Sequence, residues 1–297
     1  MIYDKAISRG DRVKVIALAT LKDMKKQRKK LNFRQKTKKK FVFYQKFDYI
    51  CTQMRNILIT LGNIPVTSSV IASLYPDVKT KFAKVAQLEK AGEIIRLRRN
   101  LFVVNPQETG QPLSSGLIAN HLLSPSYVSM QTALRYYGLI PEAVYTVQSM
   151  TFKTAKEYNT PIGNFCYYHI SRPTYPIGIT QIKEENNVYI MATPEKALCD
   201  LIANQPGINL RYKKEALEFL EENLRFDMDR FYQLNPKIFE DYANIGKKAT
   251  SIHTILKLLQ YIKQVKADVM PFIKNPKDMT IWSNEYFLQL AKMINFE

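Results

Sequence analysis

The chain has 297 residues, of which 46% are hydrophobic and 24% are charged, a composition typical of a globular protein large enough for two domains. No apolar run approaches the roughly 18 residues that cross a bilayer, and the N-terminus lacks the apolar core and cleavage site of a secretory signal. The three cysteines, Cys51, Cys166 and Cys199, are too few and too far apart for a disulfide framework or a paired-cysteine metal site. We therefore predict a cytoplasmic protein with no membrane partner.

The net charge of +18 is concentrated in the first third of the chain. Residues 1–46 contain 16 Lys/Arg and 3 Asp/Glu, and residues 47–105 contain 8 Lys/Arg and 4 Asp/Glu. The remaining 192 residues carry a net charge of only +1. Such a distribution predicts that a polyanion, such as nucleic acid, binds to the first third.

Residues 1–46 are predicted to be a basic, disordered extension, because the segment 21–40 holds 11 basic residues and a single acidic one and cannot bury a core. Two interpretations of the extension stay open. It is an arm that binds phosphates without sequence preference, or it is upstream sequence translated from an early start, since Met24 and Met54 both precede the first well-formed domain.

Residues 47–105 have the pattern of a winged helix-turn-helix. Helices are expected over 49–61, 67–74 and 78–91, and two short β runs, 93–97 and 101–104, are expected to form a hairpin. Thr67 and Asp77 are predicted to cap the second and third helices, and Asn100 suits the tight turn of the hairpin. The apolar positions predicted to be buried in the second and third helices are Val70, Ile71, Leu74, Phe82, Val85 and Leu88.

This arrangement predicts binding to double-stranded DNA. The N-terminal half of a third helix reaches base edges in the major groove, and a basic hairpin reaches phosphates or the minor groove. A helical hairpin with a merely solvated basic face is the simpler alternative, but the order of elements and the basic residues coincide here. The candidate DNA-binding residues are Lys79, Thr80, Lys81 and Lys84 on the helix, and Arg96, Arg98 and Arg99 on the hairpin.

After a turn-rich linker at 106–118, the residues up to 262 are predicted to form a mixed α+β domain with a helical C-terminal part. A helix is expected over 117–123 and strands over 144–152, 163–170, 178–182 and 187–192, with a polar connection at 153–160. Helical patterns follow at 216–224, 228–234 and 251–265. Residues 263–297 are predicted to be a helical tail, with a helix over 284–294 anchored by Trp282.

Residues 124–141, SPSYVSMQTALRYYGLIP, read as a short helix with a defined start and stop. Ser129 is expected to cap it with its hydroxyl, Gly138 allows the chain to leave it, and Pro141 prevents continuation. Val128, Ala133, Leu134 and Tyr137 recur at helical spacing. From the residues alone this is a buried aromatic helix.

A second motif, PEKALCDLI at 194–202, opens another helix. Thr193 is predicted to cap it, Pro194 takes the first helical position, and Glu195 complements the helix dipole. Lys196 and Asp200 have the spacing of a surface ion pair on a helix. General acid–base chemistry by these three side chains is an alternative, but capping and surface pairing account for them.

Together the two motifs resemble the signature of the AbiEi family. The resemblance rests on Tyr127, Val128, Ser129, Ala133, Leu134, Tyr136, Tyr137, Gly138 and the run Leu139–Glu142, and on the family's PEKAL-x-D motif. The segments YTVQSMT, TPIGNF and YYHI, which begin at Tyr145, Thr160 and Tyr167, are similar to the family's intermediate strands. The resemblance covers roughly residues 50–262, and Asn100 replaces the glycine that the family often has in the wing turn.

The resemblance implies an antitoxin of a type IV toxin–antitoxin system, which acts in phage defence, that also represses its own operon by binding its promoter. It implies a nucleotidyltransferase-like toxin as the functional antagonist, without a stable complex between the two. The motif residues carried over, as structural or functional positions, are Tyr127, Ser129, Tyr136, Tyr137, Gly138, Pro194, Glu195, Lys196 and Asp200.

No enzymatic activity, cofactor or metal is predicted. His121, His169 and His253 lie on separate elements without partners at ligand spacing, and no phosphate-loop or nucleophile-elbow motif occurs. One alternative function is a stand-alone winged-helix regulator whose C-terminal domain senses a ligand or dimerises. An enzyme that acts on nucleic acid is another, and the lack of a clustered acidic site argues against it.

Overall fold

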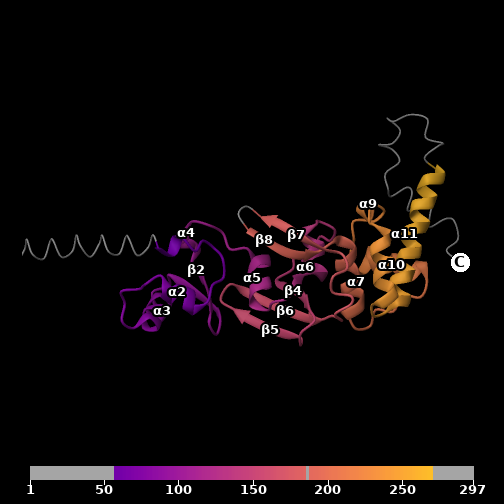
Figure 1. Ribbon diagram of the computed structural model, residues 1–297. Helices are drawn as coiled ribbons and strands as arrows, with labels where there is room; N and C mark the ends of the chain where they lie inside the picture. Colours follow the sequence, from indigo (N-terminus) through magenta and orange to yellow (C-terminus); the bar gives the residue numbers. More distant parts are fainter. Residues whose placement is uncertain (1–56, 185–186, 270–297) are drawn as a thin grey trace, which may run out of the picture. The chain divides into compact units, whose positions relative to one another are not determined.

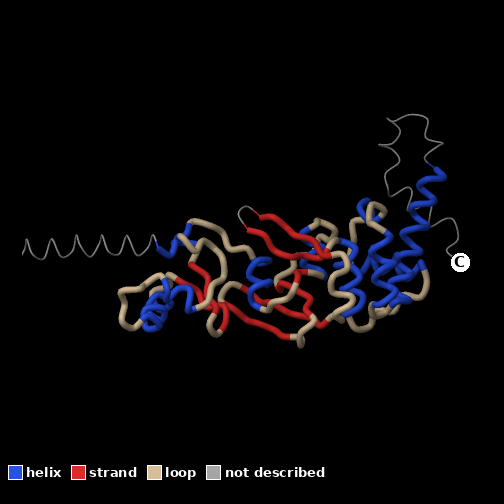
Figure 2. The backbone as a smooth tube through the Cα atoms, in the orientation of Figure 1, coloured by secondary structure: helices blue, strands red, loops and turns tan. Residues whose placement is uncertain are grey.

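The computed structural model describes residues 57–184 and 187–269 (Figures 1 and 2). The chain divides between Thr60 and Leu61, and of the first part only residues 57–60 are described. The predicted extension 1–46, most of the predicted first helix, Trp282 and the predicted helix 284–294 lie outside the described residues. The described chain is a mixture of helices and strands, so the predicted α+β class is confirmed.

Residues 61–104 contain two helices and a hairpin. Helix α2 (Ser68–Ser73) and helix α3 (Lys81–Lys90) precede strands β1 (Ile94–Arg98) and β2 (Leu101–Val104), which pair antiparallel. The Thr67 hydroxyl caps α2 as predicted, and Asn100 has a left-handed φ of 63° in the hairpin turn. Val66 exchanges two backbone hydrogen bonds of 2.8 Å with Phe102, which adds a third short extended segment beside the hairpin.

Helix α3 begins later than the sequence predicts. Its N-cap position is Thr80, not Asp77, and the Thr80 side chain makes no capping hydrogen bond. Val85 and Leu88 are buried as predicted, whereas Phe82 is 65% exposed and Val70 on α2 is 41% exposed. The helix therefore buries only its later turns, and a helical period in the sequence cannot show where a neighbouring element stops covering it.

In the part of the chain that the structure describes, six strands form the main sheet, in the order β5-β6-β4-β3-β8-β7. The pairs β4–β6 and β3–β8 are parallel, and the pairs β3–β4, β5–β6 and β7–β8 are antiparallel. The strands are β3 (Tyr127–Val128), β4 (Thr146–Thr151), β5 (Lys156–Thr160), β6 (Gly163–His169), β7 (Ile179–Glu184) and β8 (Asn187–Ala192).

The four predicted strands of this domain are confirmed as β4, β6, β7 and β8, and two strands were missed. Strand β5 lies in the segment predicted as a polar connection, because an edge strand needs no alternating apolar face. Strand β3 has only two residues and lies within the stretch predicted as one helix. Two residues are too few to establish a period.

Where the short strand β3 does not reach, a side chain bonds the backbone of β8 in its place. The Asn120 amide accepts a 2.6 Å hydrogen bond from the Ile190 backbone N–H and donates one of 3.3 Å to the Ile190 carbonyl. Asn120 thereby satisfies the backbone of β8 as a neighbouring strand would. It belongs to α5 (Ser115–Leu122), which follows a one-turn helix, α4 (Pro106–Thr109), in the predicted linker.

The C-terminal part is helical, as predicted (Figure 1). Helix α10, which begins after Asn235 and contains Tyr242, was not predicted, and α11 continues beyond the predicted 251–265. The elements are α7 (Pro194–Asn204), α8 (Lys213–Glu218), the π-helical turn Phe219–Asn223, α9 (Met228–Phe231), α10 (Pro236–Ile245) and α11 (Ala249–Val269). Helices α7, α10 and α11 pack on one another. Among the described helices, none is both long and apolar enough to cross a bilayer.

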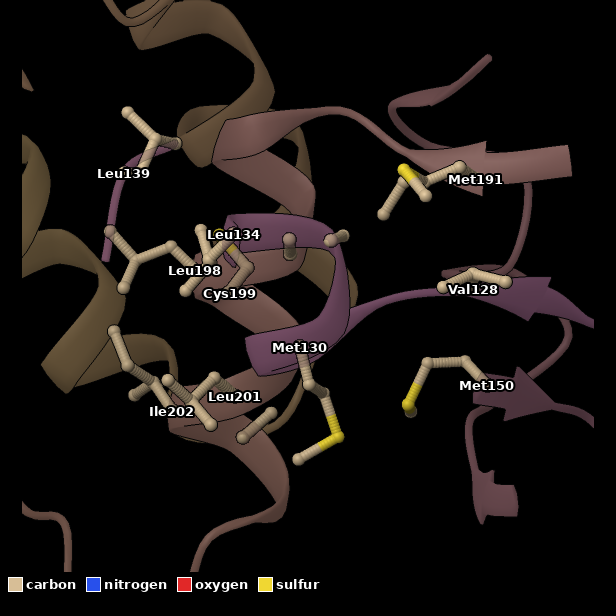
Figure 3. Close-up of a cluster of buried hydrophobic side chains, with 14 of the residues drawn as sticks. Val128, Met130, Leu134, Leu139, Met150, Met191, Leu198, Cys199, Leu201 and Ile202 are labelled. Atoms are coloured by element: carbon tan, nitrogen blue, oxygen red, sulfur yellow. The ribbon is translucent and has the colours of Figure 1, made fainter. Parts of the chain in front are cut away.

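The core of the domain lies where the sheet meets helix α6 (Met130–Tyr136) and α7 (Figure 3). Val128, Met150 and Met191 come from three neighbouring strands, and all are buried. Helix α6 contacts β4 and β8 as well as α7. The side chains that complete this cluster from the two helices are Met130, Leu134, Leu198, Cys199, Leu201 and Ile202.

Gly178 marks a close approach between the loop before β7 and helix α7. Its φ is +58°, and a Cβ atom there would lie 2.9 Å from Lys196 Cβ. We expect Gly178→Ala to lower the free energy of unfolding by more than Gly207→Ala, because both add left-handed strain of about 1 kcal/mol or more and only the first adds a clash. Gly207 has a φ of +84°, and a Cβ atom added there would have no neighbour within 4 Å. Equal losses of stability in chemical denaturation would contradict the expectation.

Candidate functional site

The carboxylate of Asp200 on α7 is fully buried and is contacted by four side chains. Tyr127 donates a 3.0 Å hydrogen bond and Ser129 a 2.8 Å hydrogen bond to Oδ2. Tyr242 donates one of 3.1 Å to Oδ1, and Lys196 Nζ lies 3.3 Å from the same oxygen. This Asp200 network joins the first motif, the second motif and α10.

Lys196 is as deeply buried as Asp200, with no exposed surface. Its Nζ donates a 2.9 Å hydrogen bond to the Thr174 carbonyl and lies 4.3 Å from the centre of the Tyr242 ring. The sequence predicts an ion pair of Lys196 and Asp200 on the surface. The pair forms, but it is buried, so the predicted exposure is wrong. Almost the whole of α7 is buried, and pair spacing alone does not reveal what covers a helix.

Burial raises the pKa of Asp200 and lowers the pKa of Lys196, because a low-dielectric interior disfavours both charges. Their mutual attraction opposes both shifts, and the hydroxyls of Tyr127 and Ser129 favour the ionised carboxylate. Burial and the nearby Asp200 also raise the pKa of Tyr127 and Tyr242, so both phenols stay protonated donors. A solute reaches none of these groups without opening the fold, so the network is a structural link.

Ser129 occupies the predicted N-cap position of α6, but its hydroxyl does not cap the helix. The hydroxyl is directed to Asp200 instead, and the Ser129 backbone N–H donates to the Gln148 carbonyl at 2.9 Å. Met130 then turns the chain out of the sheet with a φ of 54°. Hydrogen bonds to ionised groups are the stronger ones, so the side chain takes the orientation in which its hydroxyl donates to Asp200, and in that orientation the oxygen accepts no bond from the first turn of α6.

The other residues of the motifs mostly hold backbone in place. Tyr137 donates a 3.1 Å hydrogen bond to the Ala192 carbonyl, and Gly138 has a left-handed φ of 68°. Pro194 is at the first position of α7 as predicted. Glu195 is buried and accepts a 2.8 Å hydrogen bond from the backbone of Asn235, where α10 begins. It therefore ties α7 to α10 rather than acting on the helix dipole alone.

Tyr136 differs from the other motif residues because it is 47% exposed. Its ring meets Tyr137 edge to face, with the centroids 5.4 Å apart. It also lines a cavity of about 520 Å³ whose other walls include residues of α5, β4 and β8. We call this cavity the α6 cavity.

Five of the predicted DNA-binding residues are exposed on residues 61–104: Lys79, Thr80, Lys81, Arg98 and Arg99. Arg96 is exposed as well, but its side chain is fixed, because its Nε donates a 2.7 Å hydrogen bond to Glu89 and its guanidinium lies 5.1 Å from the centre of the Phe102 ring. Lys84 lies 5.6 Å from the Tyr75 ring. Two residues of the predicted set, Arg96 and Lys84, thus contact neighbouring aromatic rings.

Tyr242 and Thr174 are the members of the Asp200 network that the sequence did not indicate. Asn235 and Pro236 form a cap and first position of the same type as Thr193 and Pro194, so the start of α10 was detectable. That Tyr242 meets Asp200 depends on the packing of α10 against α7. Within residues 57–184 and 187–269, no three His, Cys, Asp or Glu side chains are grouped so that they could hold a metal ion.

Comparison of the chain with known proteins gave no match, either to a protein-family model or to a curated protein.

The Asp200 network predicts that two ion pairs of identical spacing differ greatly in their contribution to the free energy of unfolding. Asp200→Ala leaves the buried Lys196 ammonium without its carboxylate, and we expect a loss of about 3–5 kcal/mol of unfolding free energy. The matched control is Asp241→Ala, which breaks the exposed pair of Lys237 and Asp241 on α10. That change is expected to cost roughly 0–1 kcal/mol.

Urea denaturation of the full chain measures both effects. The double variant Lys196→Met/Asp200→Ala is expected to be more stable than Asp200→Ala, because it removes the unpaired charge as well. If Asp200→Ala cost no more than Asp241→Ala, Asp200 would not hold the motifs together.

Proposed function

We propose that the protein is a DNA-binding antitoxin of a type IV, AbiE-like system. It binds its own promoter and represses the operon, and it counters a nucleotidyltransferase-like toxin. The observation that carries the DNA-binding part is the exposure of basic side chains at two neighbouring places, the start of α3 and the tip of the β1–β2 hairpin. The antitoxin part is supported by the resemblance of the two motifs to the AbiEi signature.

Residues 47–105 act, in this proposal, as a winged helix-turn-helix. The support is the order of α2, α3 and the hairpin, together with the pairing of Val66 with Phe102, since a short extended segment beside the wing hairpin suits such a domain. Lys79, Thr80 and Lys81 at the start of α3 enter the major groove. Arg98 and Arg99 at the hairpin tip contact phosphates or the minor groove.

Arg96 and Lys84 have a different role from the other candidate DNA-binding residues. The ion pair of Arg96 with Glu89 joins β1 to the last turns of α3, so it sets the position of the hairpin relative to that helix. Lys84 is partly buried against Tyr75. Both residues add positive charge near the DNA while their side chains stabilise the domain.

The antitoxin part resides in residues 106–262. The first motif supplies Tyr127 and Ser129, and the second supplies the Asp200 that they bond. Two segments about 70 residues apart are thus required for one buried contact, which explains physically why they occur together. The surface that counters the toxin consequently lies on side chains outside this buried network, and a stable complex with the toxin is not required.

The hairpin tip supplies the first test. We expect Arg98→Ala/Arg99→Ala to weaken binding to the promoter DNA and to reduce the slope of log K against log salt by up to about 1.8, because each phosphate contact contributes about 0.9. The measurement is a mobility-shift titration of the full chain at several salt concentrations.

The matched control is Lys214→Ala/Lys257→Ala, which removes two exposed positive charges from α8 and α11. It lowers the net charge equally and is expected to leave the salt slope unchanged. If both double variants lost the same amount of salt slope, the hairpin tip would contribute only general positive charge. That outcome would contradict the winged-helix proposal.

The antitoxin activity is tested by co-expression. We expect the full chain to relieve growth arrest caused by the nucleotidyltransferase-like protein encoded beside its gene. Arg98→Ala/Arg99→Ala should relieve it equally well, because these side chains lie outside residues 106–262. Lack of such a neighbouring gene, or growth arrest that persists despite expression of the folded chain, would favour the stand-alone regulator instead.

A further inference from the structure

The α6 cavity is a concave site that the proposed DNA-binding and antitoxin activities do not use. Its volume of about 520 Å³ is within the range of small-molecule sites. Three of its lining residues, Leu113, Val144 and Val147, are partly buried hydrophobic side chains and give it an apolar floor. The site therefore offers apolar surface to a ligand on the side of the sheet.

Tyr136 provides an aromatic wall to this cavity. Its neighbour Tyr137 is fixed by a hydrogen bond to Ala192, whereas the Tyr136 ring is half-exposed and lines the opening. An exposed ring beside an apolar floor favours a flat, aromatic ligand, because the two surfaces can cover its faces.

The charged groups of the cavity disfavour an anionic ligand. Arg135 lines it, but its Nη1 already donates to the carbonyls of Ile140 and Pro141 at 3.2 and 3.1 Å. Glu184 also lines it and accepts a 2.6 Å hydrogen bond from Ser114. One positive and one negative side chain leave no net charge, and the carboxylate repels phosphate.

We propose that the α6 cavity binds an uncharged nucleoside. A nucleobase presents flat apolar faces and an edge of hydrogen-bond donors and acceptors, and Asn187 and Glu184 at the cavity supply groups of both kinds. The sugar is uncharged and tolerates the carboxylate of Glu184. The site is independent of the proposed DNA contacts and gives the C-terminal domain a small-molecule ligand.

Isothermal titration calorimetry of the full chain with adenosine, guanosine, cytidine and uridine tests this site. At least one nucleoside is expected to bind, its 5′-monophosphate to bind no more tightly, and ribose alone not to bind. Tyr136→Ala is expected to weaken binding about tenfold or more, because stacking on an aromatic ring contributes about 1–3 kcal/mol per base. Tyr136→Phe retains the ring and should bind like the native chain.

The matched control is Tyr145→Ala, which removes a tyrosine that is 89% exposed and does not line the cavity. It should leave the affinity unchanged. A second variant, Val147→Trp, fills the floor and should abolish binding, with circular dichroism as the check of folding. No heat with any of the four nucleosides, tighter binding of the monophosphate, or equal affinity of the folded Tyr136→Ala protein would each overturn the proposal.

Discussion

The buried carboxylate of Asp200 is the constraint on which the C-terminal domain depends. A carboxylate deprived of water must be surrounded by donors, and here Tyr127, Ser129, Tyr242 and Lys196 supply them. These residues belong to the central strand β3, the N-cap of α6, α10 and α7 itself. One charge therefore specifies how four parts of the chain meet, although burying an ion pair is by itself a weak source of stability.

Burial in this network distinguishes the motif residues that hold the fold together from those that a partner can reach. Tyr127, Ser129, Lys196 and Asp200 face one another in the interior, so they cannot touch a toxin, a nucleic acid or a small molecule. Tyr136, one residue away from the fixed Tyr137, faces the α6 cavity instead. A sequence signature of this kind thus mixes residues that hold the fold with at least one that is available for binding.

The basic residues of the N-terminal part show a similar division. Arg96, Arg98 and Arg99 are all exposed arginines, yet Arg96 alone of the three is bonded to Glu89 and contacts the Phe102 ring among the described residues. Regular alternation would place Arg96 and Arg98 on the same side of β1, but the pairing shifts register between them, since Arg96 pairs with Phe102 and Arg98 with Leu101. Only the position of α3 beside β1 places a carboxylate within reach of one of them.

The sequence by itself determined the α+β class, the strands with clear alternation, the caps at Thr67 and Thr193 and the exposed charge of the hairpin tip, because each follows from local backbone preferences and periodicity. Tertiary structure alone decided that the two-residue strand β3 exists and that the polar segment β5 is an edge strand. It also decided that the Ser129 hydroxyl donates to Asp200 instead of capping α6. It also decided that a pair with surface spacing, Lys196 and Asp200, is buried beside Tyr242. These outcomes depend on contacts between residues far apart in the chain, and local patterns carry no information about which distant element will cover them.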